Sequence, residues 1–78
     1  MQKLSPQSLL LPRGLGRIAA AAYVGISPSK FDQLVHERRM PSPRRIDTRK
    51  IWDRIELDAA FEELPNDVGA LSEANDWE

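Results

Sequence analysis

Apolar and polar residues follow one another along this 78-residue chain in a pattern that predicts three helices and one hairpin. The first helix is expected from Arg17 to about Tyr23, where alanines have high helix propensity and Ile18, Ala21 and Ala22 fall on one face. Gly25 should end it, because the residue just past a helix often needs a positive φ that glycine adopts without strain.

The second helix has the clearest local signals. Ser27 suits the N-cap, Pro28 the first helical position, and Ile26 and Phe31 the two sides of a hydrophobic staple. The helix should run from Pro28 to about Arg38 on the surface, because its apolar stripe is short. That stripe consists of Phe31, Leu34 and Val35.

A short basic hairpin is predicted next, after two prolines that end the second helix and extend the backbone. Residues 44–46 and 50–52 predict two strands around a turn near 47–49, with Ile46 and Trp52 as the inward-facing pair. A hairpin this small must pack against the helices to be stable.

A third helix should begin between Asp53 and Glu56, which have the spacing of a capping box, and end at Pro65. Its apolar positions recur at i, i+3, i+4 and i+7: Leu57, Ala60, Phe61 and Leu64. The predicted fold is therefore mainly α with a small β-hairpin, in the order helix, helix, strand, strand, helix.

Composition divides the chain into three parts. Residues 1–13, rich in proline and polar side chains, are expected to form an N-terminal arm, and residues 14–65 a single domain. Residues 66–78 are acidic and poor in apolar residues, which predicts a flexible C-terminal tail. A chain this short buries only about 60% of its unfolded surface, so neither a buried metabolite cleft nor enzymatic activity is expected.

The chain has no cysteine and one histidine, His36, which excludes disulfides, thiol catalysis and cysteine-based zinc sites. We expect no catalytic residue, no metal ligands and no cofactor. No apolar run approaches the ~20 residues needed to span a bilayer, and Met1 to Pro12 lacks the order of a secretory signal. These features predict a soluble, cytoplasmic protein.

The net charge of -1 conceals a strong asymmetry. Residues 30–54 carry eight basic side chains against four acidic ones, whereas residues 62–78 carry six acidic side chains and no basic one. The acidic end contains a candidate self-assembly site, in which an indole fills a pocket on a neighbouring protomer: Glu62, Glu63, Asp76 and Trp77. The alternative is a flexible end with an incidental aromatic residue.

A glycine turn, a capped helix and a basic hairpin follow one another within residues 25–54, an order typical of a helix-turn-helix with a wing. The residues of the second helix that would meet DNA base edges are Ser27, Ser29, Lys30 and Gln33. The wing residues that would meet phosphates or a narrow minor groove are Arg44, Arg45, Arg49 and Lys50. A generic helix pair and a charged strand edge that prevents aggregation remain open as alternatives.

The segments AAAYVGISPSKFDQLV, RRMPSPRRI and KIWDRIELDAAFEEL resemble the small winged helix-turn-helix excisionases, or recombination directionality factors, of mobile bacterial elements. The resemblance covers about residues 14–65 and extends to the DNA-binding part of MerR-type and AlpA-like regulators. It implies that the second helix enters the major groove, that the wing reaches the adjacent minor groove or backbone, and that Trp52 is structural. Two departures are Gly16 with Arg17 in place of a usual helix cap, and Asp-Thr-Arg at the wing tip, where glycines are frequent.

An excisionase of this kind would bind double-stranded DNA near an attachment site, bend it through cooperative self-association, and bias an integrase toward excision. An AlpA-like transcription regulator with the same DNA contacts is the nearest alternative. A protein-interaction module whose basic patch docks an acidic partner, without DNA, is the alternative from another class.

Overall fold

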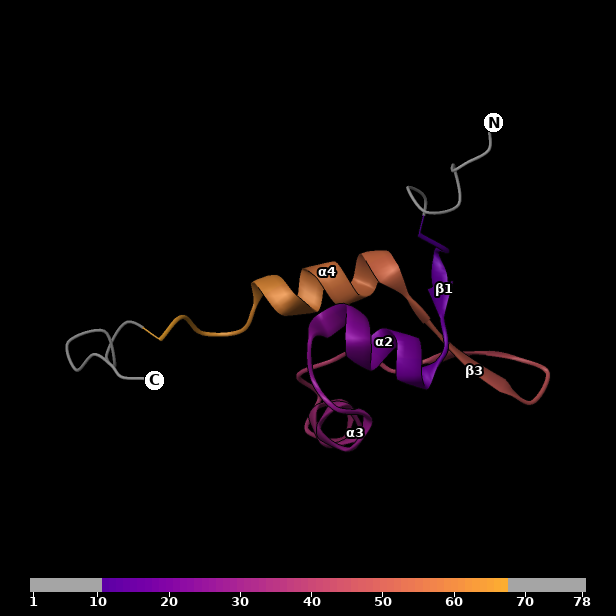
Figure 1. The fold of residues 1–78 in the computed structure, drawn as a ribbon, viewed down its shortest axis with the longest axis horizontal. Coiled ribbons are helices and arrows are strands. Elements are labelled where there is room, and N and C mark those ends of the chain that lie inside the picture. The colour runs from indigo at the N-terminus through magenta and orange to yellow at the C-terminus, as the bar shows by residue number, and fades with distance from the viewer. Residues whose placement is uncertain (1–10, 68–78) are drawn as a thin grey trace.

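The computed structural model describes residues 11–67, which form three helices and a three-stranded antiparallel sheet in a small α+β fold (Figure 1). The helices are α2 (Arg17–Val24), α3 (Pro28–His36) and α4 (Arg54–Glu62). The strands are β1 (Gly14–Leu15), β2 (Arg44–Ile46) and β3 (Arg49–Asp53), in the sheet order β1-β3-β2. The predicted succession of two helices, a hairpin and a further helix is present, and β1 is an additional strand that the sequence pattern did not predict.

Strand β1 closes the second edge of β3. Gly14 pairs with Asp53 and Leu15 with Trp52. A Cβ atom on Gly14 would lie 2.5 Å from the Ile51 side chain, so this close approach of β1 to β3 needs a glycine. Leu15 is buried and contributes to the core. It belongs to a segment whose composition did not predict a helix or a strand.

Helix α2 buries a different face from the one predicted. Ala20 and Ala21 are fully buried, whereas Ile18 is 70% exposed and Ala22 is also exposed. Of the predicted inner face, only Ala21 is therefore correct. Small side chains allow α3, β3 and α4 to pack closely against α2, and this packing leaves Ile18 on the outer side.

The turn between α2 and α3 follows the predicted local signals. Gly25 has a φ of 96° and its N–H donates to the Ala21 carbonyl at 2.9 Å, which ends α2 as expected. The Ser27 side chain accepts the Lys30 N–H at 3.1 Å, and Pro28 begins α3. Helix α3 ends at His36, two residues before the predicted end, because Arg38 adopts a positive φ of 65°.

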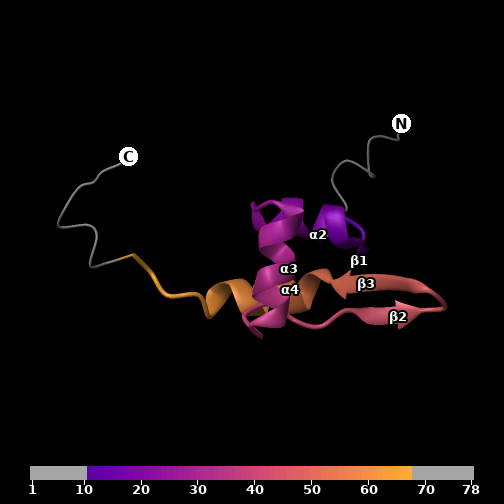
Figure 2. The same cartoon turned by 90° about the horizontal axis from the view of Figure 1, so that it is seen from below.

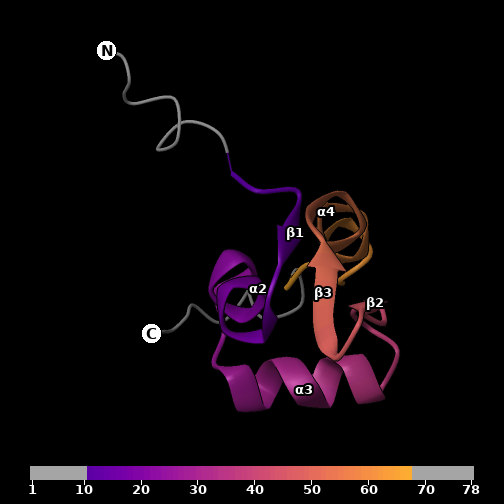
Figure 3. The same cartoon turned by 90° about the vertical axis from the view of Figure 1, so that its right-hand side faces the viewer.

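The core lies where α3, β3 and α4 meet α2. Phe31 and Leu57 are fully buried, and Trp52 is 4% exposed and donates its indole N–H to the Pro41 carbonyl at 2.8 Å. In Figure 3, α3 crosses below α2 and β3, which places the Phe31 ring against Trp52. The predicted inner stripe of α3 is confirmed, with Phe31 and Leu34 buried and Val35 half-buried.

Two predicted core positions are wrong. Ile46 is 59% exposed, because the β2–β3 hairpin extends away from the helices (Figure 2). Phe61 is 56% exposed, because the C-terminal part of α4 extends past α2 (Figure 1). The other predicted apolar positions of α4 do face the core, with Leu57 buried and Ala60 and Leu64 partly buried. Within residues 11–67, no helix is both long and apolar enough to cross a membrane.

Candidate functional site

The exposed face of α3 carries a continuous row of polar side chains. Lys30 donates its ammonium to the Gln33 side-chain oxygen at 3.3 Å, and the Gln33 amide donates to Glu37 at 3.0 Å. Arg39 donates to the other Glu37 oxygen at 3.2 Å. The hydrogen bond from Gln33, followed by that from Arg39, lowers the pKa of Glu37 and keeps it ionised. Hydrogen bonds therefore connect the row along the exposed face of α3.

Two serines complete the predicted set on this helix. Ser27 and Ser29 are both exposed at its N-terminal end. The Ser27 oxygen already accepts the Lys30 backbone N–H as the helix cap, which leaves its hydroxyl proton free to donate. Ser27, Ser29 and Lys30 thus lie at the N-terminal end of α3, Gln33 lies one turn further along, and all four remain accessible to a partner.

The hairpin separates the four predicted basic residues into two faces. Arg45 lies directly opposite Lys50, while Arg44 is opposite Ile51 and Ile46 is opposite Arg49. Because side chains alternate along a strand, Arg45 and Lys50 share the face of Trp52, which turns toward the helices. Arg44 and Arg49 lie on the other face. The structure therefore pairs Arg45 with Lys50 and separates both from Arg44 and Arg49, so the four cations do not form one cluster.

The pair of Arg45 and Lys50 carries a positive charge that residues 11–67 do not neutralise by any ion pair. Both side chains are exposed. Like charges directly across an antiparallel ladder are unfavourable by themselves, so this arrangement favours an anion between or beside them. A phosphate group is an anion of suitable charge and geometry for both side chains.

Lys50 lies on the side of the hairpin that faces α3. The pKa of Asp32, on α3, is lowered mainly by its hydrogen bond from Arg17, and the charge of Lys50 lowers it further. Arg17 donates hydrogen bonds to the Asp32 carboxylate through both its Nε and Nη2 atoms, at 2.8 to 3.1 Å, and so joins the start of α2 to α3. The cationic face of the hairpin and the helix with the polar row thus belong to the same side of the protein.

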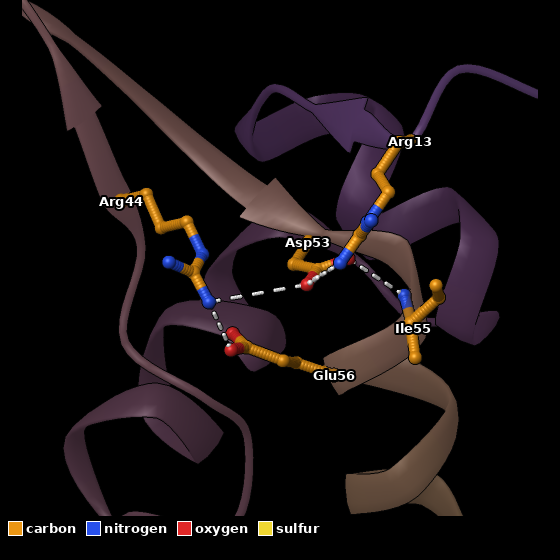
Figure 4. Close-up of polar contacts among 5 residues, drawn as sticks. All are labelled: Arg13, Arg44, Asp53, Ile55 and Glu56. Atoms are coloured by element: carbon orange, nitrogen blue, oxygen red, sulfur yellow. Dashed lines mark hydrogen bonds and ion pairs between the residues drawn. The ribbon is translucent and has the colours of Figure 1, made fainter.

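On the opposite face of the hairpin, one nearly buried carboxylate organises a network (Figure 4). Asp53 is 6% exposed and accepts two hydrogen bonds from Arg13, at 2.9 and 3.1 Å, and one from the Ile55 N–H at 3.0 Å as the cap of α4. The hydrogen bonds from Arg13 are the main reason that the pKa of Asp53 is lowered to about 2. Arg44 donates to Glu56 at 2.6 Å and lies 4.0 Å from the second Asp53 oxygen.

Sequence reasoning missed most of this network. Arg13 was placed in the N-terminal arm, but its side chain binds Asp53 and its carbonyl accepts the Arg54 N–H at 2.7 Å. The capping spacing of Asp53 and Glu56 correctly indicated the start of α4, but the Glu56 side chain binds Arg44. No signal in the sequence links Arg13 to a residue forty positions away.

The remaining predicted residues that the structure describes lie at helix ends. Glu62 and Glu63 are exposed at the C-terminal end of α4, and Asp76 and Trp77 lie outside the described residues. His36 is exposed at the end of α3. The part of the chain from 11 to 67 contains no group of three or more histidine, cysteine, aspartate or glutamate side chains placed to hold a metal ion.

Comparisons with known proteins add no relative to this picture. No protein-family model matches the chain, and searches of curated proteins and of solved structures found no significant match.

Proposed function

We propose that this protein binds double-stranded DNA as a winged helix-turn-helix protein, with α3 in the major groove and the β2–β3 hairpin as the wing. The observation that carries the proposal is the position of Arg45 directly opposite Lys50, unpaired within residues 11–67 and on the face of the sheet whose Trp52 packs against Phe31 of α3. Such a pair is unfavourable without an anion, and the DNA backbone supplies phosphates at regular spacing.

The polar row of α3 supports the same orientation. Lys30 is exposed at the N-terminal end of α3, the part of a recognition helix that meets base edges, and Gln33 is exposed one turn further along. A glutamine amide can pair with adenine through two hydrogen bonds, and a lysine can reach guanine or a phosphate. Gln33 is already oriented by Lys30 and Glu37, which reduces the entropy lost when it binds a base.

The distribution of acidic residues supports one orientation over its reverse. The exposed end of α4 carries Glu62 and Glu63, which would repel a phosphate backbone. DNA therefore approaches the side of α3 and the hairpin, and α4 remains free for proteins.

We assign the biological role of a recombination directionality factor, which bends DNA at an attachment site and promotes excision by an integrase. The supporting observation is the length of the hairpin, which extends well past the helices (Figure 2) and gives a small protein a second contact distant from α3. Contacts at two separated points can offset the cost of bending a short site, on the order of 1–6 kcal/mol.

The test is a titration of a fluorescent duplex that carries an attachment site, followed by fluorescence anisotropy. The titration is repeated at several salt concentrations between about 50 and about 200 mM. We expect Arg45→Ala/Lys50→Ala to weaken binding and to reduce the slope of log affinity against log salt by about 1.8, since each phosphate contact contributes about 0.9. The control is Arg38→Asn, which removes one positive charge from the loop after α3 and keeps a residue that tolerates positive φ at position 38.

The binding titration and an excision assay test DNA binding and the role in excision separately. If the Arg45 and Lys50 double variant binds the duplex as tightly as the unaltered chain, the proposed interface is wrong. An excision assay with an integrase then tests the role. Binding without any stimulation of excision would favour a transcription regulator.

A further inference from the structure

Arg44 is the only one of the four predicted wing cations that the structure pairs with acidic residues, among the residues it describes. Its guanidinium donates to Glu56 in the first turn of α4 at 2.6 Å. It also lies 4.0 Å from Asp53, whose two oxygens are already held by Arg13. Figure 4 shows the Arg44 side chain extending from β2 toward α4, with the Asp53 and Glu56 carboxylates next to its guanidinium group.

We propose that Arg44 is a positioning residue that sets the direction of the hairpin relative to α4, and that it does not itself contact DNA. The inference rests on the proposed DNA binding, because the direction of the hairpin decides where Arg45 and Lys50 meet the duplex. It reverses the role that the sequence alone predicts for Arg44.

The location of the Arg44 contact explains why it would matter. Strand β3 runs into α4 without a spacer, and the two elements bend at Asp53, whose φ and ψ are -76° and 120°. Arg44 stands at the base of the neighbouring strand, opposite Ile51, and its bond to Glu56 spans the inside of this bend. Within residues 11–67, the strand pairing of β2 is with β3, so this bond is a second attachment of β2 to the body of the protein.

A two-stranded hairpin is marginal by itself, and one that projects from a domain can pivot at its base. Arg44, Glu56, Asp53 and Arg13 restrict that pivot with two cations and two carboxylates in one network. The network lies on the face of the sheet opposite Arg45 and Lys50, because strand side chains alternate. It can therefore hold the hairpin without blocking the proposed DNA contacts.

Glu56→Ala distinguishes a positioning role from a direct contact, because the two roles predict effects of opposite sign. If Arg44 bound a phosphate, removing its acidic partner would free a cation, remove a repelling charge and tighten DNA binding. If Arg44 positions the hairpin, the same variant weakens binding. A fall of the competent orientation to about one third of molecules would raise the apparent Kd about threefold. The salt slope should stay unchanged, since no phosphate contact is lost.

A measurement without DNA tests the same inference independently. The chain has no cysteine, so spin labels can be attached at Thr48→Cys in the turn and Ala59→Cys on the exposed side of α4. We expect Glu56→Ala to broaden the distance distribution between the labels, and Glu62→Ala, which removes the same charge from the last turn of α4, to leave it unchanged. Arg44→Lys, which keeps a cation beside Glu56 and Asp53, should broaden the distribution less than Arg44→Ala does.

Each result has one meaning. Tighter DNA binding by Glu56→Ala, or an unchanged label distribution, overturns the positioning role even if the Arg45 and Lys50 variant confirms DNA binding. A broadened distribution in a protein that does not bind DNA would reject the proposed function, and with it the role of Arg44 in DNA recognition. Circular dichroism at the measurement temperature verifies that every variant is folded.

Discussion

The rings of Phe31 and Trp52 meet edge to face, with centroids 5.1 Å apart and planes at 72°, and they join α3 to β3. Such a pair contributes about 0.5–1.5 kcal/mol beyond the burial of its surface. We expect Phe31→Leu to lower the free energy of unfolding by at least that amount, measured by urea denaturation. Phe61→Leu makes the same chemical change at an exposed position and should cost less than about 0.5 kcal/mol. Equal losses in the two variants would show that the aromatic pair adds nothing.

The ionised Asp53 carboxylate should stabilise the fold in a pH-dependent way. Its pKa is about 2 in the folded protein, mainly because of Arg13, against an ordinary value of 3.8. A lowered folded-state pKa means that this contribution is complete above about pH 4 and is lost as the pH falls toward 2. We therefore expect Asp53→Asn to be less stable than the unaltered chain at pH 7, and the difference to shrink between pH 4 and pH 2.

Urea denaturation across this pH range measures the effect of Asp53→Asn. The control is Asp47→Asn, which removes a carboxylate from the exposed turn, where asparagine tolerates the φ of 55°. Asp47 belongs to none of the ion pairs within residues 11–67, so its replacement should leave the acid limb of the stability curve unchanged. A stability difference for Asp53→Asn that persists at pH 2 would assign the loss to packing and not to charge.

Gly25 should be sensitive to replacement because of its backbone conformation. At a φ of 96° an alanine is strained, and we expect Gly25→Ala to destabilise the fold by about 1–2 kcal/mol. A Cβ atom at this position would meet no neighbour within 4 Å, so the cost is conformational. Gly16→Ala also meets no neighbour, at an ordinary φ of -72°, and should change stability by less than about 0.5 kcal/mol in the same thermal melts.

Gln33 should contribute to the choice of DNA sequence. If its amide pairs with one adenine, Gln33→Ala should reduce discrimination at that base pair by about 1–3 kcal/mol and leave the other positions unchanged. Competition with duplexes substituted at each position in turn measures this. Lys50→Ala serves as the comparison, because loss of a phosphate contact weakens binding to all sequences equally. A uniform loss for Gln33→Ala would place its side chain on the backbone.

The acidic end of α4 should affect cooperativity more than single-site affinity. If Glu62 and Glu63 meet the basic hairpin of a neighbouring protomer, Glu62→Gln/Glu63→Gln should lower the Hill coefficient on a duplex with several sites. Binding to a duplex with one site should be unchanged. An unaltered Hill coefficient in a gel-shift titration would reject self-association through these residues.

Local chemistry along the chain was sufficient to predict where most elements begin and end. Gly25, Ser27 and Pro28 act within four residues of their own backbone partners, so their roles follow from stereochemistry that needs no tertiary context. The strand Arg44–Ile46 was predicted with its observed bounds, because the prolines before it and the turn after it limit its length. The basic character of the hairpin was equally visible in the sequence.

Which face of each element is buried, and which cations remain free, were decided by the tertiary structure. A helical period predicts an apolar stripe, but α2 buries Ala20 with Ala21 and leaves Ile18 outside, because close packing selects the small side chains. Strand β1 exists only because β3 offers it an edge, and Arg13 meets Asp53 across forty residues of chain. The same long-range network pairs Arg44 with Glu56 and leaves Arg45 and Lys50 without an ion pair among residues 11–67, since a sequence records charges but not the partners that folding gives them.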